Sequence, residues 1–281
     1  MWLFYAFLCP ILTALSNVVD KIATDRHAPE PRALNALHSL PFLLLSLALI
    51  ATNPLPAGAL LPAAAAGLIM TFSYIAYFKM LRETDVSRAI GLVYTFPVFV
   101  AVGAFLLFNE PFTLQKTAGV LLVAVGATIL ATEKLRLLPV RALALILAVS
   151  LTEAAIELLQ KGAVGNANAL AVTGIVGLAF GLTSLLAAQP SELIKAAKSK
   201  TIAYATASGT FLAAAWLAFI LAISQAQVSV VASISAIHPL AVLVVAAIVA
   251  KKAAIKLDTA DAAQKTLGIL LTMAGVAAVL L

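Results

Sequence analysis

Long apolar runs separated by short polar breaks occupy the whole chain. A helix that crosses a bilayer needs about 20 mostly apolar residues, and continuous apolarity disfavours the alternating strands of a membrane barrel. The first run lacks the basic segment and small-residue cleavage site of a signal peptide, so it counts as a span. The pattern therefore predicts an all-α polytopic membrane protein with ten transmembrane helices. The predicted spans are residues 2–19, 34–52, 59–79, 87–108, 114–132, 141–160, 168–187, 201–223, 227–250 and 264–281.

The composition supports this prediction. Of the 281 residues, 63% are hydrophobic and 11% are charged. Soluble domains are about half apolar and about a quarter charged. A soluble fold of this size cannot bury so much apolar surface. These values exclude a soluble enzyme and a disordered chain, and the single cysteine excludes a disulfide module.

The basic residues predict an orientation. Sixteen of the 18 Lys and Arg lie in or beside the loops that follow odd-numbered spans, and only Lys116 and Lys161 lie on the other side. Cytoplasmic loops of membrane proteins carry an excess of Lys and Arg. Both termini are therefore expected outside a cell (inner or plasma) membrane. The net charge of +6 does not indicate a nucleic-acid partner, because the basic residues are scattered over short loops.

The chain contains two copies of one five-helix unit, residues 1–138 and 139–281. Residues 74–87 align with residues 216–229 at one constant offset, which also places Pro97 on Pro239. Because five is odd, the second copy enters the membrane from the opposite side, and the copies form an inverted repeat. Many secondary transporters are built in this way, with the substrate site near the midplane between the repeats. The alternative interpretation is a duplication that serves stability alone.

These repeats resemble the EamA domains of the drug/metabolite transporter superfamily over nearly the whole chain. The resemblance implies a ten-helix transporter of small organic solutes and leaves the solute open. The second copy departs from the pattern, because Ala250-Lys251-Lys252 stands where the first copy has Phe108-Asn109-Glu110. The segments that carry the resemblance are residues 77–81 (Tyr-Phe-Lys-Met-Leu), 86–89 (Val-Ser-Arg-Ala), 97–99 (Pro-Val-Phe) and 109–111 (Asn-Glu-Pro).

Two carboxylates in the predicted span 141–160 are the first functional candidates. An ionisable residue at the centre of a membrane helix costs about 2.5–3.5 kcal/mol. Glu153 and Glu157 are one turn apart on one helix face, and Lys161 follows on the same face. Either carboxylate could bind a cationic substrate or couple transport to protons, because carboxyl groups withdrawn from water accept protons more readily. The structural alternative pairs Glu157 with Lys161, and Glu153 with a polar group on a neighbouring helix.

Two prolines mark matching positions in the two copies. Pro97 and Pro239 lie in the middle of the fourth and ninth predicted spans, where a proline removes a backbone hydrogen bond and kinks a helix. Matching interruptions in both halves indicate a transport site. Tyr94 and His238 stand beside these prolines and are candidate substrate-binding residues. His238 could also shuttle a proton or pair with Glu153, and the alternative is a histidine bonded to a neighbouring helix.

Four further residues are candidates for the wall of the substrate cavity, and one for a gate. Asn17 lies on the same face of the first span as Thr13, and Tyr74, Tyr77 and Trp216 occupy matching aromatic positions of the two copies. Aromatic residues at such spacings also serve as packing or interface anchors. Asp20, at the expected cytoplasmic end of the first span, is interpreted as a gate or a solvated cap.

Two features of the fifth and tenth spans point to structural roles. Glu110 is expected to cap the helix of residues 114–132 with its charge. Gly119, Gly126, Gly268 and Gly275 allow close helix contact, either between the halves or in a homodimer through the fifth and tenth helices.

The sequence contains no catalytic, nucleotide-binding or metal-binding motif, and no cofactor is expected. The hypothesis is a secondary active transporter that moves a small polar or amphipathic metabolite, such as an amino acid or amine, by alternating access. Proton coupling would run through Glu153 or Glu157. The expected partners are this substrate and the lipid bilayer. The alternatives are a flippase for lipid-linked head groups, an intramembrane enzyme that uses Glu153 and His238, and a non-transporting scaffold or receptor.

Overall fold

The computed structural model describes residues 1–27, 29–54, 56–83, 92–111, 113–131, 140–253 and 262–280. Within these ranges every regular element is a helix. The helices are α1 (Trp2–His27), α2 (Pro31–Thr52), α3 (Ala57–Glu83), α5 (Phe96–Phe108), α6 (Leu114–Ala131), α7 (Val140–Val164), α8 (Ala169–Ala187), α9 (Pro190–Ala197), α10 (Thr201–Ile223), α11 (Val228–Ser235), α12 (His238–Ala253) and α13 (Ala262–Leu280).

The prediction of an all-helical, multi-pass membrane protein is confirmed. In the described part of the chain, seven segments are long and apolar enough to cross a membrane, and α11 with the start of α12 counts as one of them. Three shorter apolar helices lie in α5, α6 and α13. The number of ten spans is therefore not confirmed.

The predicted boundaries need three corrections. The first span does not end at residue 19, because α1 buries Asn17 and Asp20 against its neighbours and continues to His27. The ninth span, residues 227–250, is divided into α11 and α12. The short helix α9 follows α8 and was not predicted. The start of the fourth predicted span and residues 86–89 of the family resemblance lie outside the described residues.

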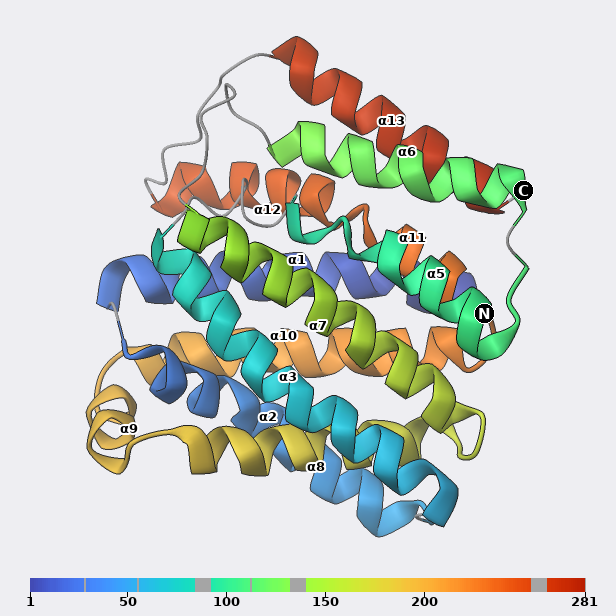
Figure 1. Ribbon diagram of the computed structural model, residues 1–281. Coiled ribbons are helices and arrows are strands. Elements are labelled where there is room, and N and C mark those ends of the chain that lie inside the picture. Colours follow the sequence, from blue (N-terminus) through green and yellow to red (C-terminus); the bar gives the residue numbers. More distant parts are fainter. Residues whose placement is uncertain are drawn as a thin grey trace.

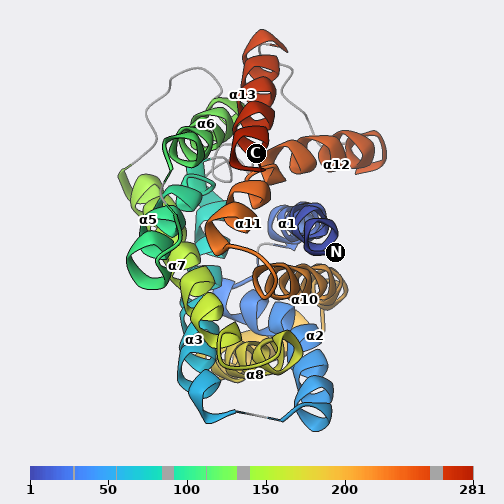
Figure 2. The ribbon, with the colours of Figure 1, turned by 90° about the vertical axis from the view of Figure 1, so that its right-hand side faces the viewer.

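The long helices form one bundle, in which α3 and α7 are inclined to α1, α8 and α10 (Figure 1). Both chain termini lie at one end of the bundle, and α9 lies at the opposite end. Seen along the bundle, α1 and α10 form one wall, α3 and α7 form the facing wall, and α6 with α13 stand apart from both (Figure 2). This arrangement leaves the centre of the bundle to side chains from facing helices.

Helix contacts occur in reciprocal pairs across the two predicted copies. The first helix packs on the eighth predicted span (α1 on α10), and the sixth packs on the third (α7 on α3). Likewise α1 contacts α12, and α7 contacts α5. Two pairs join equivalent helices directly, α2 with α8 and α6 with α13. Exchanging the copies therefore reproduces the pattern of contacts.

Glycines bring α6 and α13 into backbone contact. A Cβ atom placed on Gly275 would lie 2.6 Å from the carbonyl oxygen of Gly119. One placed on Gly126 would lie 2.8 Å from the carbonyl oxygen of Gly268. The small-residue faces of these two helices thus meet within one chain, as close packing of membrane helices requires. The homodimer through the fifth and tenth helices stays a prediction.

Candidate functional site

Two helix interruptions face the centre of the bundle at matching positions. A two-residue turn, Tyr94 and Thr95, precedes α5, and another, Ala236 and Ile237, precedes α12. Pro97 and Pro239 are the second residues of α5 and α12. A proline is tolerated in the first helical turn because its missing N–H has no partner there. Each predicted kink is therefore a break at which a new helix begins.

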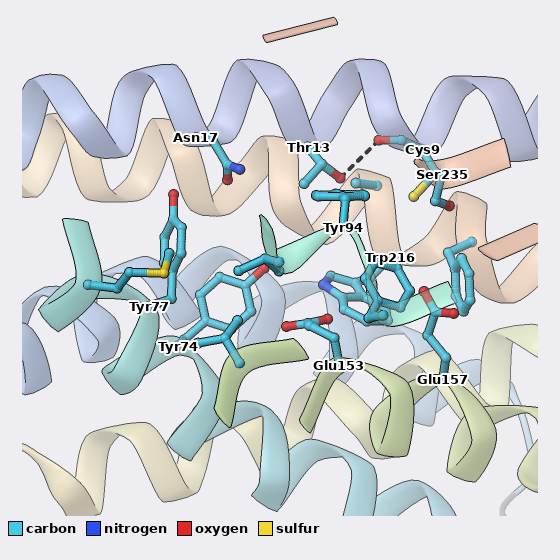
Figure 3. A pocket seen from close by; sticks show the side chains of 16 residues that line it. Cys9, Thr13, Asn17, Tyr74, Tyr77, Tyr94, Glu153, Glu157, Trp216 and Ser235 are labelled. Carbon is cyan, nitrogen blue, oxygen red and sulfur yellow. Dashed lines mark hydrogen bonds between the residues drawn. The ribbon is translucent and has the colours of Figure 1, made fainter. Parts of the chain in front are cut away.

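A cavity lies beside these interruptions. Its walls come from α1, α3, α7, α10, α11 and the segment around the start of α5 (Figure 3). Both predicted copies thus contribute side chains to it. The lining residues are Cys9, Thr13, Asn17, Tyr74, Tyr77, Met80, Val93, Tyr94, Phe96, Val149, Glu153, Glu157, Ala215, Trp216, Phe219 and Ser235.

Glu153 and Glu157 reach this cavity from one face of α7 (Figure 3). The Ser73 hydroxyl donates to Glu153 Oε1 at 3.1 Å, which fulfils the structural alternative for Glu153. Glu157 is 4% exposed, and its buried Oε2 atom has no hydrogen-bond partner. A buried carboxylate oxygen without a hydrogen-bond donor costs free energy. A ligand that donates a hydrogen bond to this oxygen would remove that cost.

The pair predicted between Glu157 and Lys161 is not formed. Lys161 Nζ donates to the carbonyl oxygens of Ile223 and Ala226, each at 2.7 Å. These carbonyls lie at the C-terminal end of α10, where unpaired carbonyl groups and the helix dipole attract a cation. The lysine therefore ties α7 to the end of α10 and leaves Glu157 uncompensated.

Aromatic side chains form much of the cavity wall. The rings of Tyr74 and Tyr77 meet edge to face, with centroids 5.6 Å apart. Trp216 meets Phe219 in the same way at 5.5 Å. Tyr94 stacks on the ring of His238 at 4.5 Å. Each of these contacts fixes the orientation of a side chain that faces the cavity.

His238 lies behind the cavity wall and does not line the cavity. The amide nitrogen of Asn17 lies 3.2 Å from His238 Nε2, and the imidazole is fully buried. The predicted pair with Glu153 is not among its contacts, whereas the neighbouring-helix bond is present. His238 therefore supports two residues that do line the cavity, Asn17 and Tyr94.

Asp20 is fully buried and is not a solvated cap. Its Oδ1 atom lies 3.5 Å from Nδ1 of the equally buried His38, and neither carboxylate oxygen has a hydrogen-bond partner. Tyr77, which lines the cavity, likewise has a buried hydroxyl group without a hydrogen-bond partner among the described residues. The sequence prediction missed the Asp20–His38 pair because it ended the first span at residue 19, which placed Asp20 outside the membrane.

The first part of the chain is similar to a known family. The model of the EamA-like transporter family matches residues 1–132. The resemblance noted in the sequence is thereby confirmed over these residues, and the matched family is one of membrane transporters.

A solved crystal structure shares the fold of nearly the whole chain. It superposes with a TM-score of 0.71 and is 16% identical in sequence. The match covers 98% of this chain and 93% of the other. At this identity the match concerns the fold alone. Comparison with curated protein sequences gives no significant match.

The EamA-like unit contacts the second predicted copy through Glu110. Its carboxylate accepts hydrogen bonds from the backbone N–H groups of Val228 at 2.8 Å and Ser229 at 3.2 Å, and from the Ser229 hydroxyl. Glu110 therefore caps α11, and the predicted cap of residues 114–132 is wrong. The reason lies in Asn109, whose left-handed conformation (φ 52°) ends α5 and turns the chain toward α11. Lys116 completes the cluster, 3.6 Å from Glu110 Oε2 and 2.6 Å from Gln227 Oε1.

Replacing Glu110 with Ala is expected to destabilise the protein by about 1–2 kcal/mol, because removal of an N-cap acceptor costs about that much. The loss also leaves Lys116 without its carboxylate partner. A thermal unfolding midpoint measured in detergent provides the test. Glu192→Ala is the matched control, since Glu192 is partly exposed and lies 3.8 Å from the exposed Lys195. Equal midpoints for the two variants would contradict the capping role of Glu110.

Proposed function

We propose that this protein is a secondary active transporter that moves a small polar or amphipathic metabolite across a cell membrane by alternating access. The observation that carries the proposal is the central cavity, which is lined by helices of both predicted copies and contains Glu153 and Glu157. A largely apolar lining with a few polar groups is typical of small-molecule sites. The family match over residues 1–132 supports transport as the activity.

The reciprocal helix contacts support an inverted repeat of residues 1–138 and 139–281. The contact of α1 with α10 is then equivalent to the contact of α7 with α3. A tilt of the helices at one contact would close one end of the cavity, and the same tilt at the other contact would close the opposite end. The interruptions before Pro97 and Pro239 lie beside the cavity in both copies and supply backbone that can adjust during such a movement. Under this proposal, both termini are outside the cell.

The cavity residues take distinct roles in the proposed cycle. Asn17, Tyr74, Tyr77, Tyr94 and Trp216 bind the substrate, and His238 positions Asn17 and Tyr94 from behind. Glu153 and Glu157 contact the polar end of the substrate and couple its passage to protons. Asp20, on α1 beyond the lining residue Asn17, acts as a gate between the cavity and the end of the bundle that carries α9.

A ligand screen with the purified protein tests this function. Thermal unfolding would be measured against amino acids, sugars, nucleosides and amines at two pH values. A ligand that binds only the folded state at about 100 times its Kd adds about 2.7 kcal/mol of stability. A hit that is accumulated in proteoliposomes under a pH gradient supports the proposal. Absence of any hit, together with stabilisation by lipid-linked phosphates, would instead favour a flippase.

A further inference from the structure

The central cavity is lined by two carboxyl groups without a basic partner. Sixteen of the described residues line it, and these include two carboxylates and not one Lys, Arg or His. A charge that is buried without a partner is strongly unfavourable, whereas a pair with matched hydrogen bonds is tolerated. The cavity therefore favours a ligand that brings positive charge.

Two lysines near the carboxylates Glu157 and Glu110 are bound outside the cavity. Lys161, one turn beyond Glu157 on α7, is held by the carbonyl oxygens of Ile223 and Ala226. Lys116 contacts Glu110 and Gln227. Neither ammonium group is therefore available to neutralise the cavity, and Glu157 Oε2 keeps no donor.

The aromatic side chains beside the carboxylates can bind a cation. Tyr74 and Trp216 lie on either side of Glu153, and Tyr94 lies above it (Figure 3). An ammonium group over an aromatic ring gains about 0.5–2 kcal/mol, and Trp is the best such ring. Trp216 and Phe219, in edge-to-face contact, also offer an apolar surface to the rest of the ligand.

We propose that the substrate is an organic cation with one ammonium group and a flat apolar body, of the arylalkylamine class. This inference rests on the proposed transport function. The ammonium has three donors and binds between Glu153 and Glu157. The apolar body lies against Trp216 and Phe219. An organic anion, or the carboxylate of an amino acid, would meet two carboxylates without a basic side chain in the lining.

Matched ligands that differ in charge provide the test. The purified full-length protein is titrated with benzylammonium, 2-phenylethylammonium and 4-phenylbutylammonium, and binding is measured by calorimetry and thermal shift. The neutral 3-phenylpropanamide, the anionic 3-phenylpropanoate and zwitterionic phenylalanine serve as comparisons. At least one ammonium ion is expected to bind about tenfold or more tightly than each of the others, since a hydrogen bond to a charged group contributes about 1.5–3 kcal/mol.

Two pairs of variants separate the proposed contacts from effects on folding. Glu157→Gln is expected to weaken ammonium binding at least about tenfold, whereas Glu192→Gln, at a partly exposed position, leaves it unchanged. Trp216→Leu is expected to weaken binding more than Trp216→Phe, because phenylalanine keeps an aromatic face. The second pair decides the question if Glu157→Gln fails to fold.

The outcomes distinguish this inference from the transport proposal. Tighter binding of the amide, the propanoate or phenylalanine would overturn the organic cation and leave transport of another solute intact. Failure of every ammonium ion to bind, alongside a hit from another class in the wider screen, would have the same meaning. Failure of both the ammonium series and the wider screen would overturn the two proposals together.

Discussion

Replacing Glu153 with Gln is expected to abolish the pH dependence of transport. Glu153 reaches the cavity from α7 beside Tyr74 and Trp216, and it keeps a hydrogen bond from Ser73 (Figure 3). Glutamine preserves the size of the side chain and can still accept this bond, but it cannot exchange a proton. If Glu153 couples transport to protons, the variant loses accumulation driven by a pH gradient and retains its fold.

The measurement compares two modes of transport in proteoliposomes that contain the same variant. Accumulation under a pH gradient reports coupling, and exchange of labelled for unlabelled substrate at equal pH reports movement of the loaded carrier. Glu153→Gln is expected to reduce the first by at least about tenfold, a factor that corresponds to 1.4 kcal/mol. Ser73→Ala serves as a companion variant, because it removes the hydroxyl donor to Glu153 and leaves the carboxyl group in place. A pH profile of Glu153→Gln that matches the unchanged protein would remove Glu153 from the coupling mechanism.

Part of the cavity wall was predictable, because some of its residues follow two strong rules. An ionisable residue inside an apolar run costs free energy in the membrane, and this rule identified Glu153 and Glu157 as candidates. The internal repeat then directed attention to Pro97 and Pro239, and the structure places an interruption before each of them. Helices become recognisable in this chain because each apolar run is long and bounded by short polar breaks. The position of a membrane span therefore depends on local composition, which can be determined directly from the sequence.

The polar contacts between helices were not predictable in the same way. Glu110 was assigned to the helix that follows it, but the turn at Asn109 directs it to α11, 118 residues later. Lys161 has a carboxylate one turn away and instead binds the end of α10. In both cases the partner is a set of backbone groups at a helix end. Such groups are present in every helix, so the sequence gives no sign of which end a charged side chain will reach.

Burial of polar residues shows the same limit. His238 was expected in the cavity and instead supports Asn17 and Tyr94 from behind. Asp20 was placed outside the membrane by the apolar count, yet α1 continues past it and buries it beside His38. A window of hydropathy cannot tell whether a polar residue ends a span or lies inside it. The answer depends on which face of the helix meets its neighbours, here α2, α3 and α10.

Asp20→Asn is expected to raise the stability of the protein and to impair transport. The Asp20 carboxylate is fully buried, and neither of its oxygens has a hydrogen-bond partner. A buried polar group in this condition costs about 1–3 kcal/mol, and more when it is charged. Asparagine keeps the shape of the side chain and removes the charge. Since 1 kcal/mol corresponds to about 2–4 °C in proteins of 150–250 residues, an increase of several degrees in the unfolding midpoint is expected.

The same substitution is expected to lower transport at least about tenfold, because a costly buried charge is retained where function requires it. Transport in proteoliposomes and thermal unfolding in detergent are measured on the same preparation. Asp25→Asn, in the same helix, is the control, because Asp25 is exposed and pairs with Lys21 at 2.8 Å, so both readouts should stay unchanged. A lower midpoint with full transport would make Asp20 a structural partner of His38 and exclude it as a gate. A higher midpoint with transport lost would instead show that Asp20 destabilises the folded protein and is needed for transport, as expected of a gate between Tyr77 and the α9 end of the bundle.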